Sequence, residues 1–552
     1  TLEVLDDILH TTKSYREVSL GLVQIPLAQV VGTKTAGRSN SFSSNFMPIL
    51  DPNSEFASKW MTLSTAQQEE GITDPIIAYE YMNKFYVLEG NKRVSVLKYY
   101  DAVSVMGQVT RILPKKTDDY DVKLYYEFVD FYSLSEINYL YFSKLGSFEK
   151  LQTVVGKKPG EVWSHNERID FRSLFLTFKS KYDEIGGENL KEITCGDAFL
   201  AFTQLYGYKE LLEMSDSELT KLINSNFSEF ELMSDTEVDL RMTASTKKAS
   251  VLTKLLTPGA KHLKVAFIYE KTSASSAWTY SHELGRLHLN EVFPDDVTTV
   301  YYDSINSHNI EEAIDDAIAN GCNVIFTTSP TFSQASLKAA IANPKITILN
   351  CSLHDPHTSM RTYYARMHEA KFIMGAVAGS MAAHDKIVYI ADYPIYGTIA
   401  NINSFAQGVK MTNPRAKIHL LWSCLKDVDV EEQIKQLQPD CVSDKDLSVP
   451  EAGTRYYGLY MSYPDSIWNL AIPIYNWGKF YEQLIEAILN GTWKADDSKN
   501  VKAINYWWGM AENAIEVISS PWLPEGIKKL INLLTKTIRS GDFNPFSGII
   551  YS

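Results

Sequence analysis

From about Lys264 onward, apolar runs of strand length alternate with amphipathic stretches of helix length such as IEEAIDDAIAN. The runs are KVAFIYE, VTTVYY, CNVIFTT, KITILN, KIVYIAD and KIHLLWS. Repeated strand–helix–strand units require right-handed crossovers, so the pattern predicts parallel sheet covered by helices on both faces. Because about six such units precede residue 440 and more chain follows, we expect two α/β lobes.

The N-terminal half follows other periodicities. Between Val18 and Lys116, aromatic and β-branched residues alternate around Asn83, which predicts a strand, a turn and a second strand, and residues 91–100 predict a short helix. From residue 117 to 245 the spacing is mostly helical. A small, basic stretch ending in Pro258 and Gly259 is typical of a linker. The expected domains are therefore residues 1–116, a helical middle region with linker at 117–260, and 261–552.

Composition narrows the function classes. At 552 residues and 45% hydrophobic content the chain can bury more than one core, while a net charge of −14 argues against a protein that coats nucleic acid. The five cysteines are dispersed, with no pattern of a disulfide framework or a zinc site. No apolar run is long enough to span a bilayer. The chain begins with Thr1, so we expect the native start to be absent and leave a removed signal or lipid anchor open.

Candidate binding residues follow the strands of the C-terminal half, since ligands of open α/β sheets bind beyond the carboxyl ends of the strands. Small hydroxyl residues and then Trp278 come at a predicted helix start, which places a flat aromatic face beside free backbone N–H groups. This arrangement suits a planar ligand with hydroxyl groups. The alternative, of equal weight, is that Trp278 packs the helix onto the sheet. The candidates here are Glu270, Ser275, Ser276, Trp278, Thr279 and Thr328.

The run VAFIYEKTSASSAWTYSHELGR resembles the opening of the basic membrane protein (BMP) family, the purine-nucleoside-receptor type of ABC-importer binding protein. Four further runs match it in order: YYARMHEAKFIMGAVAG, KIVYIADYPIYGTIANINSFAQGVKMTNPRAKIHLLWS, PIYNWGKFYEQLIEAILNGTW and YWWGMAENAIEVIS. The resemblance implies an α/β, type 1 periplasmic-binding-protein fold of two Rossmann-like lobes with a nucleoside-like ligand between them. It assigns base stacking to Trp278 with Thr279 as polar neighbour. For the second lobe the resemblance implies that Tyr393, Pro394, Tyr396 and Trp422 lie where they can contact the ligand.

The chain departs from the family pattern at its acidic positions. KTSASS replaces the family's acidic first loop, leaving Glu270 as the nearest carboxylate, and a later acidic position is matched only approximately by Ser462 and Asp465. Ribose recognition by a carboxylate pair is therefore an open question, and a different ligand remains compatible with the sequence.

The N-terminal segment containing DPIIAYEYMNKFYVLEGNKRVSVLKYYDAV resembles the ParB-like fold, in which a strand leads into a Gly-x-x-Arg box at a helix start. Gly90, Asn91, Lys92 and Arg93 match that box. Backbone N–H groups at a helix start and two cations are suited to an anion or nucleotide. The alternative is a purely structural strand-to-helix turn.

No catalytic motif, metal site or cofactor motif stands out, and we expect a protein that is not an enzyme. His282 and His288 lack the spacing of a zinc-binding helix, and Pro356 interrupts the His354–His357 run.

The leading hypothesis is the solute-binding protein of an ABC importer, membrane-associated outside the cytoplasm if a lipoprotein signal has been removed, with a permease as partner. The alternative is a cytoplasmic metabolite sensor in which the BMP-like module regulates the ParB-like and helical regions. A ParB-like nucleotide hydrolase or nuclease is a third hypothesis.

Overall fold

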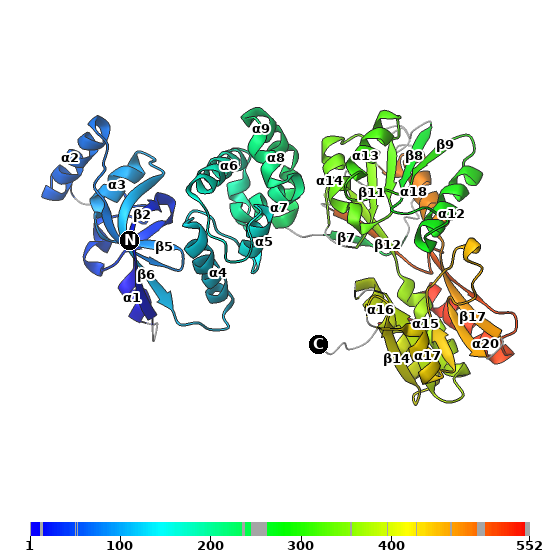
Figure 1. The fold of residues 1–552 in the computed structure, drawn as a ribbon. Coiled ribbons are helices and arrows are strands. Elements are labelled where there is room, and N and C mark those ends of the chain that lie inside the picture. The colour runs from blue at the N-terminus through cyan, green and yellow to red at the C-terminus, as the bar shows by residue number, and fades with distance from the viewer. Residues whose placement is uncertain are drawn as a thin grey trace. The chain divides into compact units, whose positions relative to one another are not determined.

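The computed structural model describes residues 2–10, 15–49, 51, 53–234, 238–243, 262–353, 356–392, 394, 396–426, 428–463, 466–493 and 503–546 (Figure 1). The chain forms two compact units, Thr1–Ser234 and Asp235–Ser552. Among the described helices, none has the length and apolar character that crossing a membrane requires.

The first part of the N-terminal unit is a six-stranded sheet in the order β1-β3-β5-β4-β6-β2. Met82 and Asn83 both adopt positive φ angles (49° and 65°) in a two-residue turn, which confirms the predicted strand–turn–strand. The predicted short helix is also present. The strands are β1 (Glu3–Val4), β2 (Tyr15–Pro26), β3 (Val30–Thr33), β4 (Ile76–Tyr81), β5 (Lys84–Glu89) and β6 (Ser104–Pro114), and the helices are α1 (Leu5–His10), α2 (Glu55–Glu69) and α3 (Asn91–Tyr99).

The rest of this unit is helical, as its spacing predicts, and its core is rich in Phe and Tyr. Ser164, Thr194 and Ser215 each begin a helix with a reciprocal capping box, so local sequence fixes these helix starts. The helices are α4 (Tyr120–Ser135), α5 (Ser147–Val154), α6 (His165–Glu184), α7 (Cys195–Tyr206), α8 (Tyr208–Glu213), α9 (Asp216–Ser225) and α10 (Phe227–Ser234).

A buried polar cluster joins the sheet to the helical part of the N-terminal unit. Glu80 on β4 pairs with Arg111 on β6, and the Tyr125 hydroxyl on α4 donates to the Glu80 carboxylate at 2.9 Å. All three side chains are almost completely buried. This cluster therefore connects the sheet to α4 within one compact unit.

The C-terminal unit has two lobes. Lobe 1 is a seven-stranded, wholly parallel sheet in the order β7-β18-β12-β11-β10-β8-β9. Its strands are β7 (Val238–Arg241), β8 (Leu263–Ile268), β9 (Val297–Tyr302), β10 (Val324–Thr327), β11 (Thr347–Cys351), β12 (Arg361–Ala365) and β18 (Ala503–Trp508). The accompanying helices are α12 (Ala277–Val292), α13 (Ile310–Ala319), α14 (Ser333–Ala342) and α18 (Trp477–Leu489).

Lobe 2 is a six-stranded mixed sheet in the order β14-β13-β15-β16-β17-β19. Only β14, β13 and β15 are mutually parallel; the other pairings are antiparallel, a feature that the expected parallel pattern did not include. Its strands are β13 (Lys386–Ala391), β14 (Lys417–Trp422), β15 (Cys441–Ser443), β16 (Leu459–Tyr463), β17 (Ser466–Tyr475) and β19 (Ile515–Ser519). Its helices are α15 (Met367–Met381), α16 (Tyr396–Thr412), α17 (Val430–Leu437) and α20 (Glu525–Arg539).

Within the described residues the chain passes between the lobes from β12 to α15, from β17 to α18 and from β18 to β19. One apolar core runs through both lobes, including Leu263 of the first and Phe405 of the second. These crossings between two Rossmann-like lobes give the type 1 periplasmic-binding-protein fold, as predicted.

The N-terminal edge of the C-terminal unit lies before the expected boundary at residue 260. Strand β7 pairs in parallel with β18, Val238 opposite Ala503, and so belongs to the sheet of lobe 1. The two compact units divide between Ser234 and Asp235. The further division of the N-terminal unit into two domains stays a prediction.

Candidate ligand-binding site

The carboxyl ends of β8 and β10 bring two predicted residues of lobe 1, Glu270 and Thr328, close together. The Ser329 hydroxyl donates to the exposed Glu270 carboxylate at 2.9 Å, and the buried Thr328 hydroxyl donates to the carbonyl of Ile268 at 3.0 Å. Adjacent strand ends are thus cross-linked by side chains. Glu270 keeps solvent access and is available to a ligand's hydroxyl groups.

Helix α12 starts beside these strand ends. The Ser276 hydroxyl accepts from the backbone N–H of Thr279 at 3.3 Å and caps the helix. Ser275 lies in the preceding turn, where the Thr272 hydroxyl donates to its Oγ at 2.8 Å, and the Thr279 side chain is buried. Of these predicted residues, Ser275 therefore has the greatest exposure to solvent, while Thr279 faces the protein interior.

Trp278 is held at a defined orientation and is only partly buried. Its indole N–H donates to the carbonyl of Thr328 at 2.8 Å, which ties two predicted residues directly together. Its ring lies 5.3 Å from that of Tyr475 in an edge contact and 6.3 Å from that of Tyr364 with a 30° tilt. Both interpretations of Trp278 thus have support, because it packs onto neighbouring aromatic rings and still retains exposed surface.

Three rings around Trp278, those of Tyr364, Tyr475 and Trp477, come from segments that connect the lobes and were not among the predicted site residues. Tyr475 stacks on Trp477 at 5.4 Å with an interplanar angle of 5°. His282 stacks on Trp477 at 4.5 Å and is completely buried, and this burial lowers the pKa of its imidazole well below the usual range. His282 is therefore a packed, neutral histidine. The runs PIYNWGKFY and YYARMHEAKF, which carried part of the family resemblance, contain three of the missed residues.

Lobe 2 approaches this aromatic group at the start of α16. A Cβ built at Gly397 would lie 3.3 Å from the Tyr364 hydroxyl, so the first turn of α16 lies directly against a ring that neighbours Trp278. Trp422 ends β14 and is partly buried against the core. Tyr393 and Asp465 lie outside the described residues, as does the side-chain placement of Tyr396.

An acidic residue that the sequence analysis missed follows β15 in lobe 2. Asp446 pairs with the buried Lys371 of α15 and keeps about a quarter of its side chain exposed. Burial alone would lower the pKa of Lys371, but Asp446 and Tyr389 outweigh burial and raise it, so the lysine stays charged. Burial raises the pKa values of Tyr364 and Tyr475, and the Asp446 charge adds to this increase.

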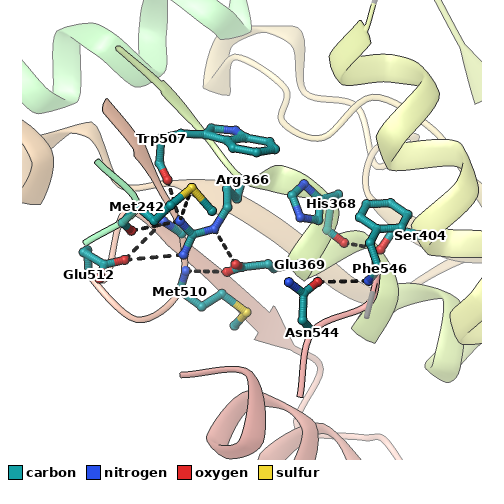
Figure 2. A network of polar contacts seen from close by, with 11 residues as sticks. Met242, Arg366, His368, Glu369, Ser404, Trp507, Met510, Glu512, Asn544 and Phe546 are labelled. Carbon is teal, nitrogen blue, oxygen red and sulfur yellow. Dashed lines mark hydrogen bonds and ion pairs between the residues drawn. The ribbon is translucent and has the colours of Figure 1, made fainter. Parts of the chain in front are cut away.

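Arg366, at the first crossing between the lobes, is the centre of a buried polar network (Figure 2). Its backbone N–H donates to the carbonyl of Trp508 at 2.8 Å, and its guanidinium donates to Glu369 at 2.6 Å and lies 3.6 Å from Glu512. The guanidinium also donates to the carbonyl of Met242 at 2.9 Å. This single side chain therefore links two crossings to the segment that follows β7.

The Gly90–Arg93 turn has the local geometry expected at a helix start. Gly90 has φ of 103°, and a Cβ there would lie 2.6 Å from Ile76, so the turn requires glycine. The Arg93 guanidinium donates to the carbonyls of Asp74 and Pro75 at 2.9 and 2.6 Å, and the Lys92 ammonium lies 4.5 Å from the centre of the Phe56 ring. An anion site at this turn stays a prediction. In the described residues no group of His, Cys, Asp and Glu is arranged to hold a metal ion.

Residues 262–434 match the model of the Bmp family, described as ABC transporter substrate-binding protein PnrA-like. This match confirms the predicted resemblance to the BMP family for that part of the chain and supports a solute-binding role.

Two relatives and a solved structure each cover about half of the chain. A purine-binding protein of Brucella abortus (strain 2308) is 28% identical over 312 residues, which are 53% of this chain and 86% of the relative. A putative ABC transporter glucose-binding protein of Haloferax volcanii is 20% identical over 302 residues, 52% of this chain and 74% of the relative. The structure of an ABC transporter solute-binding protein from Conexibacter woesei is 15% identical, with a TM-score of 0.40, over 51% of this chain and 98% of that one.

Proposed function

We propose that the C-terminal unit binds a purine nucleoside, or a similar aromatic metabolite, between its two lobes and serves as the solute-binding component of an ABC importer. The proposal depends on Trp278, a partly exposed indole that is held at the carboxyl ends of the lobe 1 strands. The purine-binding relative from Brucella abortus supports the ligand class.

The surrounding residues suit such a ligand. Apolar and aromatic surfaces supply most of the burial for a small molecule, and a few polar groups set its orientation. Trp278 and Tyr364 offer aromatic surface, while Glu270 in lobe 1 and Asp446 in lobe 2 offer carboxylates for hydroxyl groups. A ligand that contacts both lobes stabilises the closed arrangement, so closure follows from binding.

Calorimetric titration of the intact chain with a panel of nucleosides and free bases tests the proposal. Stacking of a base on an aromatic side chain contributes about 1–3 kcal/mol, so Trp278→Ala should weaken binding by about 5- to 150-fold. Asp446→Asn should weaken nucleosides more than free bases, because only the nucleosides carry the sugar hydroxyls. Trp60→Ala, which removes an indole from the N-terminal unit, is the matched control and should leave affinity unchanged. Absence of binding heat with every compound would reject the ligand class.

A second candidate function, a metabolite sensor, is favoured by the contacts of β7 and Met242. This segment follows the N-terminal unit along the chain, pairs with β18 and bonds to the guanidinium of Arg366 between the lobes. Movement of the lobes about these crossings would alter the contacts that β7 and Met242 make with β18 and Arg366. Ligand binding would in this way affect the segment that follows the N-terminal unit in the chain.

Hydrogen exchange of residues 238–242, measured with and without a saturating ligand, separates the two functions. A sensor should show a change in amide protection there when ligand binds, and Arg366→Met should abolish that change. Equal protection in both states, with closure seen elsewhere in the C-terminal unit, would leave the importer function alone.

A further inference from the structure

A cavity of about 520 Å³ lies in lobe 2, beside the part of β17 that extends past the end of β19. β17 runs from this cavity toward Tyr475 near the lobe crossings, and both β17 and α20 are labelled in Figure 1. Trp468 precedes Tyr475 by seven positions, about 23 Å at roughly 3.3 Å per strand residue. The lining reaches Ile472, three positions or about 10 Å before Tyr475, but none of the lining residues belongs to the aromatic group around Trp278.

The walls of this cavity expose unusual amounts of aromatic surface. Of the lining residues, Trp522 is 84% exposed, Trp468 is 53% exposed and Ile518 is 51% exposed. A group of large apolar side chains exposed on one surface marks a binding site on many proteins. The volume of the cavity falls in the range of about 300–1,000 Å³ that is typical of small-molecule sites.

One cation gives the cavity its chemical preference. Arg455 is the only charged residue among the lining residues that the structure describes, and no carboxylate in the described residues pairs with its guanidinium. Its backbone is held in place, because the Asn469 amide donates to the carbonyls of Arg455 and Tyr457 at 2.8 and 3.1 Å. The other polar residues of the lining are Tyr457, Asn469, Ser519 and Ser520. An exposed cation beside two indoles favours a flat ligand with a single negative charge.

We propose that this cavity is a second binding site, which takes a planar aromatic carboxylate. The ring system lies against Trp468 and Trp522, and the carboxylate pairs with Arg455. The cleft between the lobes is not involved, so the proposal stands independently of the nucleoside site.

Binding of 2-naphthoate to the intact protein, followed by calorimetry and by ligand-observed NMR, tests the site, with neutral 2-naphthamide as the matched compound. Naphthoate should bind saturably and more tightly than naphthamide. Arg455→Gln should weaken naphthoate by about tenfold or more and leave naphthamide unchanged, since only the carboxylate forms the charged pair. Trp522→Ala should weaken both compounds, and its high exposure makes misfolding of this variant a minor concern.

Trp278→Ala is the control for the other cleft and should leave naphthoate binding unchanged. Three results would overturn the proposal: no saturable binding of naphthoate, binding that survives both Arg455→Gln and Trp522→Ala, or binding that Trp278→Ala removes. Sedimentation velocity can give a fourth result that would overturn the proposal. Self-association of the chain that Trp522→Ala abolishes would identify a second copy as the occupant.

Discussion

Replacement of Arg366 by Met tests whether one cation holds the crossings between the lobes together. Met retains an unbranched aliphatic chain like the stem of Arg, but the substitution removes every hydrogen bond of the guanidinium. Glu369 and Glu512 would then be two carboxylates of like charge in a buried site, with the backbone N–H of Met510 donating to Glu369 at 2.7 Å as partial compensation.

The magnitude follows from the loss of a buried partner. Breaking a buried ion pair by removing one side costs about 3–5 kcal/mol, because the remaining charge is uncompensated. The carbonyl of Met242 also loses its donor. We therefore expect the free energy of unfolding of the C-terminal unit to fall by about 4 kcal/mol. Arg415→Met is the control, since Arg415 is 85% exposed and its ion pair contributes little.

The cost should depend on pH in a defined direction. Burial already raises the pKa of Glu512 above its usual range, and removal of the cation raises it further. A carboxyl group whose pKa is higher in the folded than in the unfolded state favours folding at low pH, and this advantage disappears as pH rises through the folded-state pKa. Arg366→Met should therefore be less destabilised at pH 5 than at pH 8.

Urea unfolding and scanning calorimetry at pH 5 and pH 8 measure these effects, with hydrogen exchange assigning the transition to the C-terminal unit. The double variant Arg366→Met, Glu369→Gln should recover part of the lost stability at pH 8, because it removes one of the two buried charges. A loss below about 1 kcal/mol for Arg366→Met at pH 8, equal to that at pH 5, would refute the reasoning.

Two further predictions concern other parts of the chain. Arg111→Met should lower the free energy of unfolding of the N-terminal unit by about 3–5 kcal/mol at pH 8, because it leaves Glu80 buried without its cation. Since burial raises the pKa of Glu80, urea unfolding should show a smaller loss at pH 5, and equal losses would contradict this assignment. Gly375→Ala should destabilise the packing of α15 on α16 by about 1–3 kcal/mol or more in thermal unfolding, because the new Cβ would lie 2.0 Å from the carbonyl oxygen of Phe405. A Cβ at Gly526 in α20 would meet no atom within 4 Å, so Gly526→Ala should leave stability unchanged or slightly higher. A loss like that of Gly375→Ala would contradict the assignment of that loss to the close contact with Phe405.

Part of the candidate site could be predicted from the sequence. Trp278 was expected at a helix start after the first strand of the C-terminal half, and it is the second residue of α12, because strand length, capping residue and helical spacing are local features. Its neighbours were not accessible in the same way. Tyr364, Tyr475 and Trp477 reach it from segments far along the chain, and their proximity depends on how the lobes are connected.

Asp446 and Met242 illustrate the same limit. Nothing in the residues near Asp446 indicates that Lys371 of a distant helix would hold it, and nothing near Met242 indicates that its carbonyl would meet Arg366. β7 joins lobe 1 because β18 leaves an edge open to a further parallel strand, and β18 comes much later in the chain.

By itself the sequence determined the alternation of strands and helices in the C-terminal half, the helical character that follows the first sheet, and the glycine turn at Gly90, since each depends on side-chain periodicity or backbone preference within a few residues. The tertiary structure alone decided the antiparallel half of lobe 2, the place of β7 and the rings that surround Trp278. Those features arise from pairings between distant segments, where strand edges and buried surfaces select their partners only once the chain is folded.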